Sequence, residues 1–475
     1  RPAARPTRGT LAKEHGMTTM MPPGRRLGRR ATLILLAATA LAAAAPVPRA
    51  AAQDAAAPLD LPTLLRLVAD GSQAAATAAA DLEAATAGID RSRAHWWPSV
   101  DLSGQYTWRD NPIEAQAGTF SFPTTEQNNG QYALEARELV YDGGRRSLAV
   151  DAAERRAEAV RLGGAAAVQQ AQLEAVDAYL AILELTGSRR VLESRRQALE
   201  AHQRTVQDLF DQGLTARNDL LETGVRVRAV DDQLQAVDDR LAVARGDLNR
   251  RLGRDPQSPL ALPDSLPPPP ALAGGRDALL ADAVQANARL LAADARHAAG
   301  LGELALARRA WFPSLFVGAQ HAYVQNQFLV HESLNMVTAG VAWNLFDGGV
   351  RKADIRRAEA ATASTARDRL EVERAVGVAV DDAWRRWEQA HRELGTARAD
   401  VEAAGENLRI VEDQYREGVA RSSDVLDAET LLARARFDVV RRHYQTYRAQ
   451  ADLLTAAGRD LAAFYGGAPA GAGKD

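Results

Sequence analysis

One short pattern occurs twice in the chain, each time between two stretches of different composition. ELVYDGGRRSLAVDAAER runs from Glu138 to Arg155, and WNLFDGGVRKADIRRAEA runs from Trp343 to Ala360. In both, an aromatic residue, Asp and two glycines separate an apolar, alternating stretch from a charged, alanine-rich one. Alternation indicates a strand, and an alanine-rich charged stretch favours a helix. The pattern therefore predicts two places at which a strand leads directly into a helix.

The pattern belongs to a repeat that covers most of the chain. Asp142 and Asp347 lie 205 residues apart, whereas the motifs WWPSV and WFPSL, which begin at Trp96 and Trp311, lie 215 apart. The first copy therefore has the longer loop between these landmarks. The proline-rich stretch between the copies is expected to be a stiff, extended linker. The predicted organisation is a signal peptide at 1–52, a first repeat at 53–253, a linker at 254–276, a second repeat at 277–460 and a flexible tail at 461–475.

The N-terminal residues have the composition of a targeting segment. Arginines precede the apolar run ATLILLAATALAAAA (Ala31–Ala45), and small residues around Ala52 offer a cleavage site, which together predict a secretory signal peptide. The residues before Met17 or Met21 are compatible with an over-extended gene start. A short membrane anchor is the alternative, but the run is too short to span a bilayer comfortably. We expect an exported chain without a lipid anchor, because the sequence contains no cysteine.

The remaining composition argues against several functions. The net charge of −3 disfavours a nucleic acid or an anionic membrane held by bulk charge. Without cysteine, disulfides, thiolate metal sites and thiol catalysis are excluded. The sequence has no phosphate-binding glycine loop and no nucleophile elbow, and HES (His331–Ser333) lacks the second histidine of a zinc helix. We predict that the chain is not an enzyme and holds no cofactor or metal, so that the energy for any transport comes from a partner.

Each copy contains two alternating segments with the length of a tilted membrane strand. In the first, Val100, Leu102, Tyr106 and Trp108 share one face, and polar residues occupy the other. The predicted strands are 99–110 and 130–141 in the first copy, and 314–325 and 336–346 in the second. Five of the seven tryptophans fall in or beside these segments, consistent with an interfacial aromatic girdle: Trp96, Trp97, Trp108, Trp311 and Trp343.

The rest of each copy is predicted to be helical. A helical stretch precedes the strands at 61–95 and at 277–310, and each ends where an aromatic residue is followed by proline. Long helices follow at 145–253 and 350–458, with apolar residues every seventh position on both sides of a central turn. Such heptads require partner helices in coiled-coil packing. As one helix, Arg145–Asp211 would measure roughly 100 Å. Heptads alone favour a soluble coiled-coil rod.

Strands and helices together point to an oligomer. An exposed amphipathic hairpin is not stable alone in water, and a bilayer tolerates only closed barrels. The four strands of one chain are too few to close a barrel, since the smallest membrane barrels have about eight strands. Two chains would supply eight strands and three would supply twelve, and the polar strand faces favour the larger ring with a wet lumen. The residues alone thus predict an oligomeric pore with a long helical stalk.

These features resemble the TolC-like outer membrane efflux protein family over about Leu59 to Asp460. The resemblance rests on the signal peptide, the tandem repeat, W/F-P-S, Y/F-D-G-G opening a long helix, and G-x-x-x-x-S/N-D at the helix turns. It implies a mainly α fold with membrane β: a homotrimer whose long helices form an α-helical barrel across the periplasm, and whose strands, four per chain, form a 12-stranded β-barrel in the Gram-negative outer membrane. It implies an exit duct of a tripartite efflux pump or a type I secretion system. The implied partners are a periplasmic adaptor (membrane fusion) protein, a proton-driven or ATP-driven inner-membrane pump and outer membrane lipid.

The helix turns are the candidate working sites. By resemblance they are periplasmic tips where the adaptor docks, at Gly213, Leu214, Thr215, Gly418, Val419 and Ala420. Asp424 and Asp427 share one helix face because they are three residues apart. They match the acidic pair that narrows the family's periplasmic entrance, and three chains would bring six carboxylates into a cation-attracting ring. Capping of a helix N-terminus is the alternative role for Asp424 and for its counterpart Asp219.

Two further sets of residues have expected roles. The resemblance also makes Asp219, Glu222, Arg217 and Arg421 candidates for a latch between neighbouring helical hairpins. The strand-to-helix joints are Asp142, Gly143, Gly144, Asp347, Gly348 and Gly349: each Asp is placed to cap the following helix, and each glycine pair permits the bend. A soluble periplasmic coiled-coil scaffold or adaptor is the competing function, and the cargo is not determined by the sequence.

Overall fold

The structure is a computed structural model that describes residues 58–467. The predicted signal peptide and residues 468–475 of the predicted tail lie outside the described residues. Within 58–467, none of the helices combines the length and the apolar character needed to cross a membrane.

The helices fall into two matching series, one per repeat. Those of the first repeat are α1 (Leu61–Gly71), α2 (Gln73–Ala94), α3 (Arg145–Asp211) and α4 (Arg217–Arg251). Those of the second are α5 (Arg276–Ala286), α6 (Ala288–Arg308), α7 (Val350–Arg416) and α8 (Ser422–Ala456), followed by α9 (Leu461–Gly466). The long helices begin at the predicted residues 145 and 350, and α3 and α7 each run for 67 residues from the joint to the tip turn, but α4 and α8 end at 251 and 456, two residues before the predicted ends.

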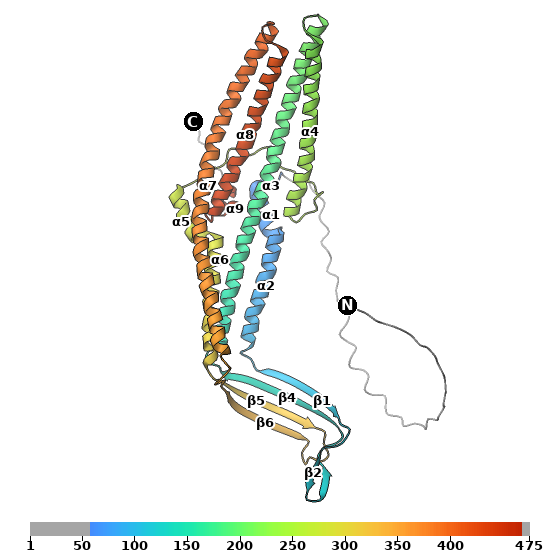
Figure 1. The fold of residues 1–475 in the computed structure, drawn as a ribbon, viewed down its shortest axis with the longest axis vertical. Helices are drawn as coiled ribbons and strands as arrows, with labels where there is room; N and C mark the ends of the chain where they lie inside the picture. The colour runs from blue at the N-terminus through green and yellow to red at the C-terminus, as the bar shows by residue number, and fades with distance from the viewer. Residues whose placement is uncertain (1–57, 468–475) are drawn as a thin grey trace, which may run out of the picture. The chain divides into compact units, whose positions relative to one another are not determined.

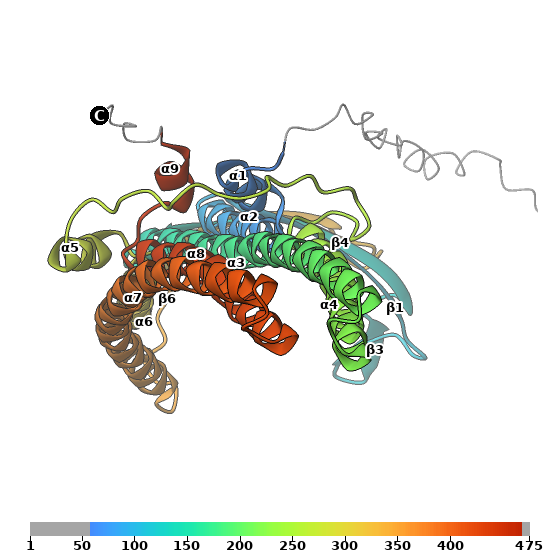
Figure 2. The ribbon, with the colours of Figure 1, turned by 90° about the horizontal axis from the view of Figure 1, so that it is seen from above.

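The long helices carry the strands at one end and the tip turns at the other (Figure 1). α4 packs back along α3, and α8 packs back along α7 and also against α3. α2 and α6 cover the parts of α3 and α7 nearer to the strands. Seen along the helices, α4, α3, α8 and α7 follow an arc, with α1, α9 and the linker on its convex side (Figure 2).

The four long strands form one antiparallel sheet in the order β1-β4-β5-β6. Their bounds are β1 (Ser99–Trp108), β4 (Asn128–Tyr141), β5 (Ser314–Val324) and β6 (Ser333–Ala342). Each repeat supplies one hairpin, and β4 and β5 join the two hairpins in a register that runs from Gln131↔Val324 to Leu139↔Phe316 and then shifts by one residue, to Tyr141↔Leu315. β1 and β6 are left as edges.

Several predicted bounds were wrong. β6 starts at Ser333 and ends at Ala342, so that Trp343–Phe346 are not strand. Their counterparts Glu138–Tyr141 are strand because they pair with β5, although β1 begins only opposite Arg137. Trp343–Phe346 have no such second neighbour among residues 58–467. The first copy's longer loop also contains an unexpected hairpin, β2 (Glu114–Ala117) with β3 (Phe120–Pro123).

The two helical stretches before the strands are each broken once, which the sequence analysis missed. The break after α1 lies at Ser72, whose hydroxyl accepts a hydrogen bond from the Ala75 N–H at 3.1 Å. The break after α5 lies at Asn287, whose Oδ1 accepts from the N–H groups of Arg289 and Leu290. Each polar side chain caps the following helix and so ends the preceding one.

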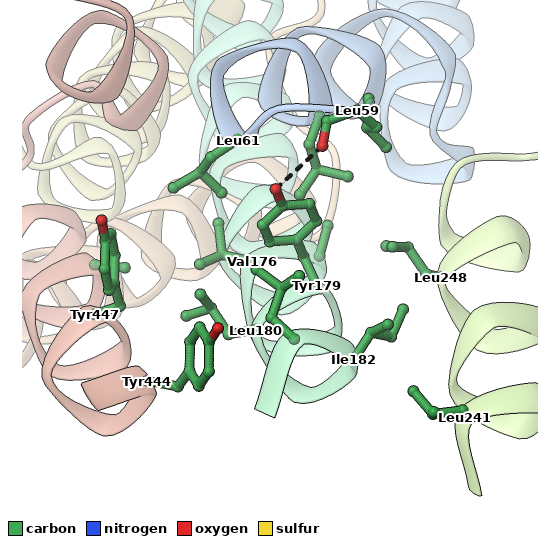
Figure 3. Close-up of a cluster of buried hydrophobic side chains, with 14 of the residues drawn as sticks. Leu59, Leu61, Val176, Tyr179, Leu180, Ile182, Leu241, Leu248, Tyr444 and Tyr447 are labelled. Carbon is green, nitrogen blue, oxygen red and sulfur yellow. Dashed lines mark hydrogen bonds between the residues drawn. The ribbon is translucent and has the colours of Figure 1, made fainter. Parts of the chain in front are cut away.

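The main hydrophobic core lies where α1, α3, α4 and α8 meet. Tyr179 is fully buried there, and its hydroxyl donates to the Leu59 carbonyl at 3.1 Å (Figure 3). The linker is extended, as predicted, but it is tied to this core: Tyr447 Oη donates to the Pro267 carbonyl at 2.7 Å, and Leu266 packs against the cluster. The expected flexible tail is wrong for Leu461–Gly466, because this segment forms α9 and buries Leu461 beside α1.

Candidate functional site

The first strand-to-helix joint is organised by the Asp142 carboxylate. It accepts hydrogen bonds from three successive backbone N–H groups, those of residues 144, 145 and 146, at 3.0, 3.1 and 2.8 Å. The first N–H groups of a helix have no partner within the helix, so the side chain satisfies them in place of water. The predicted capping role of Asp142 is therefore confirmed.

The second joint repeats this geometry. Asp347 accepts from the N–H groups of Gly349 at 3.0 Å and Arg351 at 3.2 Å, which confirms the cap. All four glycines of the joints have positive φ, between 66° and 95°. A residue with a Cβ atom is strained at positive φ, whereas glycine is not, so the predicted need for glycine pairs is also confirmed.

Each joint also contains a buried arginine that the sequence analysis missed. Arg146 and Arg351 are both only 8% exposed, and their guanidinium groups stack on Trp96 at 4.4 Å and on Trp311 at 4.2 Å. Such cation–π contacts hold the end of α2 or η1 (Arg309–Trp311) against the start of the long helix. The signal was present, because an arginine follows the Asp by four residues in both copies.

The two arginines differ in their remaining contacts. Arg146 Nη1 donates to the His95 carbonyl and to Glu138 Oε1, both at 3.3 Å. Arg351 Nε donates to Asp347 Oδ2 at 2.6 Å, but its two terminal nitrogens are buried without a partner among the described residues. Trp343 stands in the second copy where Glu138 stands in the first. In the same part of the chain, the first joint also has two buried atoms without a hydrogen-bond partner, Arg146 Nε and Glu138 Oε2, so the joints differ in which groups are bonded and not in how many.

The tip turns are two copies of one helix-ending motif. Gly213 and Gly418 have φ of 75° and 77°. The next residue donates its N–H back into the helix, from Leu214 to the Leu209 carbonyl at 2.8 Å and from Val419 to the Gln414 carbonyl at 2.9 Å. This pattern is the Schellman motif, in which glycine takes the left-handed position. The side chains of Leu214 and Val419 are exposed at the tips.

The acidic residues behind the tips do not share one role. Asp424 accepts a hydrogen bond from the Arg421 N–H at 2.9 Å, so it caps α8, and it is still exposed together with Asp427. Asp219 caps no backbone N–H of α4; its Oδ2 accepts from the Thr215 hydroxyl at 2.7 Å. Buried residues separate Asp424 from Asp427 along α8, which leaves both carboxylates on its open face.

The predicted latch is not formed within the chain. Glu222 pairs with Arg226 at 3.3 Å, one turn along α4. Neither Arg217 nor Arg421 forms an ion pair with another residue in the part of the chain that the structure describes. The latch stays a prediction for contacts between chains.

A polar seam between α3 and α8, close to the tips, was also missed. His202 Nε2 lies 2.9 Å from Ser422 Oγ, and its ring packs against Tyr415 with centroids 5.2 Å apart. Burial lowers the pKa of His202, and it raises the pKa of Glu429 two turns further along α8. The seam therefore joins the two helical hairpins of one chain through polar contacts, whereas the core nearer the linker joins them through apolar ones.

Comparison with known proteins identifies the family. A model of the outer membrane efflux protein family matches residues 64–254 and 279–459. Protein CyaE of Bordetella pertussis is 31% identical over 171 residues, which are 35% of this chain and 36% of CyaE, so the match spans about a third of that relative. The outer membrane protein VceC of Vibrio cholerae has a similar structure, with a TM-score of 0.69 at 17% identity, covering 84% of this chain and 96% of VceC. CusC has a TM-score of 0.71 at 18% identity, covering 90% of this chain and all of CusC.

The structural matches, at these identities, show the fold, and the family model shows the relationship. Both of its segments fall on the two repeats found in the sequence, and together they cover most of the chain. The chain belongs to the outer membrane efflux protein family.

Proposed function

We propose that three copies of the chain form an outer membrane channel that serves as the exit duct of a tripartite efflux or type I secretion system. One observation carries the proposal: the four-stranded sheet is open at both edges and exposes apolar side chains. Leu102 on β1 is 75% exposed and Val337 on β6 is 80% exposed. Side chains of this kind suit lipid, and lipid requires a closed barrel.

Closure of the barrel determines the number of chains. Four strands cannot close, and twelve strands from three chains enclose an aqueous channel more readily than eight. The opposite face of the sheet supports a wet lumen, because Asp101, Ser103 and Gln105 line it on β1. In this arrangement the twelve-stranded barrel lies in the outer membrane, and α3 and α7, each of roughly 100 Å, extend into the periplasm.

The far end of the helices is proposed to meet the partners. Exposed Leu214 and Val419 are suited to hydrophobic contact with a periplasmic adaptor protein, which connects the duct to an inner-membrane pump. Asp424 and Asp427 of three chains are proposed to form the acidic entrance ring, because both are exposed on one face of α8. Arg217, Arg421, Asp219 and Glu222 are proposed as latch residues between chains. Membership in a family of transport proteins supports these roles.

Cell fractionation with conductance recording tests the proposal. We expect the protein to stay in the outer membrane after osmotic shock, to be extracted only by detergent, and to give stepwise conductance in planar bilayers. Release by osmotic shock without any conductance would instead support the competing function, a soluble periplasmic scaffold. The exposed apolar sheet faces disfavour that alternative, because a soluble rod would gain nothing from them.

A further inference from the structure

The two repeats match element by element at fixed spacings. The spacing is 215 residues from α1 to β1 and 205 from β4 to α4, as the starts of all the paired elements show. The hairpin registers obey the same spacings, since Ser99 lies opposite Arg137 and Ser314 lies opposite Ala342. The one large departure is the end of β6, which stops four residues before the counterpart of Tyr141. Within one chain, the end of the first repeat contacts the start of the second. Because the repeats match residue by residue, the end of the second repeat can contact the start of the first repeat of another chain in the same way.

The first joint is completed by a residue of the second repeat. Phe312 fills the space beside Gly143 so closely that a Cβ atom on Gly143 would lie 2.4 Å from the Phe312 Cβ. At the second joint, a Cβ atom on Gly348 would have no neighbour within 4 Å. The counterpart of Phe312 in the first repeat is Trp97, which is 79% exposed in its own chain. The second joint therefore has an open notch beside Gly348. Trp97, the residue that would fill it by position, is exposed and makes no such contact within residues 58–467 of its own chain.

We propose that the second joint is completed in trans, by Trp97 of a neighbouring copy seated against Gly348. β1 of that copy then pairs with β6 and turns Trp343–Phe346 into strand. This inference rests on the proposed trimer and specifies how its chains meet. It explains why Trp343–Phe346 are irregular in the single chain: the strand that pairs with them belongs to another copy.

Transposing the β4–β5 register gives the pairing between chains. Ala342 lies opposite Ser103 of the neighbouring copy, Trp343 opposite its Leu102, and Val337 opposite its Trp108. The register thus places apolar side chains beside apolar ones on the outer face, and small or polar ones together on the inner face. A slip of one residue would place Trp343 opposite Ser103 and mix the two faces. The side-chain chemistry therefore supports the same register that the repeat spacing predicts.

At the opposite edge of the chain, beside β1, a helix is incompletely covered as well. α6 packs between α3 and α7, and five of its residues are buried. Its counterpart α2 packs on α3 and, at its start, against α1, but it has no contact like that of α6 with α7, and none of its residues is buried. Transposition places α2 against α7 of the neighbouring copy, directly above the joint that Trp97 completes. In the proposed assembly, the open notch and the short strand of one copy therefore meet the uncovered helix of the next copy at one boundary.

Disulfide trapping tests the register, and the absence of cysteine makes the chain a clean background. We expect the double variant Ala342→Cys with Ser103→Cys to form covalent dimers and closed trimers on oxidation in outer membranes. The matched control is Ala342→Cys with Gln105→Cys, which places the second thiol on the same face of β1 but about 7 Å further along. The control is expected to stay monomeric on a denaturing gel. Equal or stronger linking of the control pair, or no linking of either pair in an intact trimer, would overturn the inference.

The same experiment separates this inference from the proposed function. If the unmodified protein is monomeric after gentle detergent extraction, the trimer itself fails. If it is trimeric but the first cysteine pair does not link, only the proposed boundary fails.

The role of Trp97 is tested by subunit exchange between two differently tagged trimer populations in detergent. We expect Trp97→Ala to exchange at least about tenfold faster than the unmodified protein, because a large aromatic anchor is lost from a packed contact. Trp97→Phe is the matched control, since Phe is the residue that fills the first joint, and it should exchange at nearly the unmodified rate. If Trp97 acts only as a membrane-interface residue, all three proteins will exchange alike, and that result would refute its role in the joint.

Discussion

The joints and the tips are built from the same residue types but have opposite surroundings. At both, glycine takes a left-handed conformation and an Asp stands near the start of a helix. At the first joint the Asp142 carboxylate is buried and accepts three backbone N–H groups, and a buried arginine stacks on tryptophan beside it. At the tip Asp424 accepts one N–H group and stays exposed, with Val419 projecting nearby. The joint is built to keep one geometry, whereas the tip leaves its side chains available to a partner.

The largest expected effect comes from removing the buried carboxylate of the first joint. Asp142→Ala leaves three N–H groups without their acceptor and removes the carboxylate that lies 3.4 Å from Arg146 Nε, and we expect it to lower the free energy of unfolding by about 3 kcal/mol. Heat denaturation of the detergent-solubilised protein measures this loss. Asp219→Ala at the tip is the matched control and should cost less than about 1 kcal/mol. Equal losses would contradict the contrast between joint and tip.

The glycines of the two joints give the next effect. Gly143→Ala and Gly348→Ala both place a side chain at positive φ, which costs about 1 kcal/mol, but only Gly143→Ala also collides with Phe312. In the unassembled chain we expect Gly143→Ala to be clearly the more destabilising. In the assembled protein the two variants should become similar, because Trp97 of a neighbouring copy then occupies the space beside Gly348. Denaturant unfolding before and after assembly compares them, and a persistent difference would count against a shared joint geometry.

The acidic pair of the second tip should control ion selectivity. We expect Asp424→Asn with Asp427→Asn to reduce the preference for cations over anions by roughly tenfold at low salt, measured as reversal potentials in planar bilayers. The control is Asp219→Asn with Glu222→Gln, whose carboxylates are engaged by Thr215 and Arg226. An unchanged preference in the first variant, or an equal change in the control, would remove the entrance ring from Asp424 and Asp427.

The smallest expected effect is the pH dependence of the seam at His202. Burial lowers the pKa of His202 in the folded chain, so the unfolded chain binds the proton more readily. The stabilisation is present above the unfolded pKa of about 6.5 and is lost as the pH falls through and below it. The protection factors for hydrogen exchange at residues 422–430, which correct for the slower intrinsic exchange at lower pH, should therefore decrease from pH 7.5 to pH 5.5.

His202→Gln should remove this decrease in protection while keeping a hydrogen bond to Ser422. The comparison of His202→Gln with the unmodified protein is needed because two other charged groups, Glu429 and Asp219, lie near the seam. The pKa of Glu429 is raised by burial, so its protonation favours the folded state at low pH and opposes the His202 effect, and Asp219 lies near Tyr415. A decrease in protection that is unchanged in His202→Gln would assign the pH dependence to those groups.

Local patterns predicted much of this molecule, and contacts between distant parts explain the rest. Asp142 and Gly143 could be recognised because capping and positive φ are local requirements. The break at Ser72 was missed because apolar residues continue on both sides of it, and the packing of α1 into the core lies outside any local pattern. The end of β6 was misplaced for a different reason, because Trp343–Phe346 alternate like a strand but lack a partner in their own chain. The role of His202 could not be predicted from any local sequence pattern, because it depends on the packing of α3 on α8.

The mass of the native complex tests the central claim most directly. Native mass spectrometry of protein extracted from outer membranes with a mild detergent counts the chains in one complex. We predict three chains and twelve strands, with both edges of every four-stranded sheet paired. A monomer, a dimer, or a soluble species found without detergent would contradict the account.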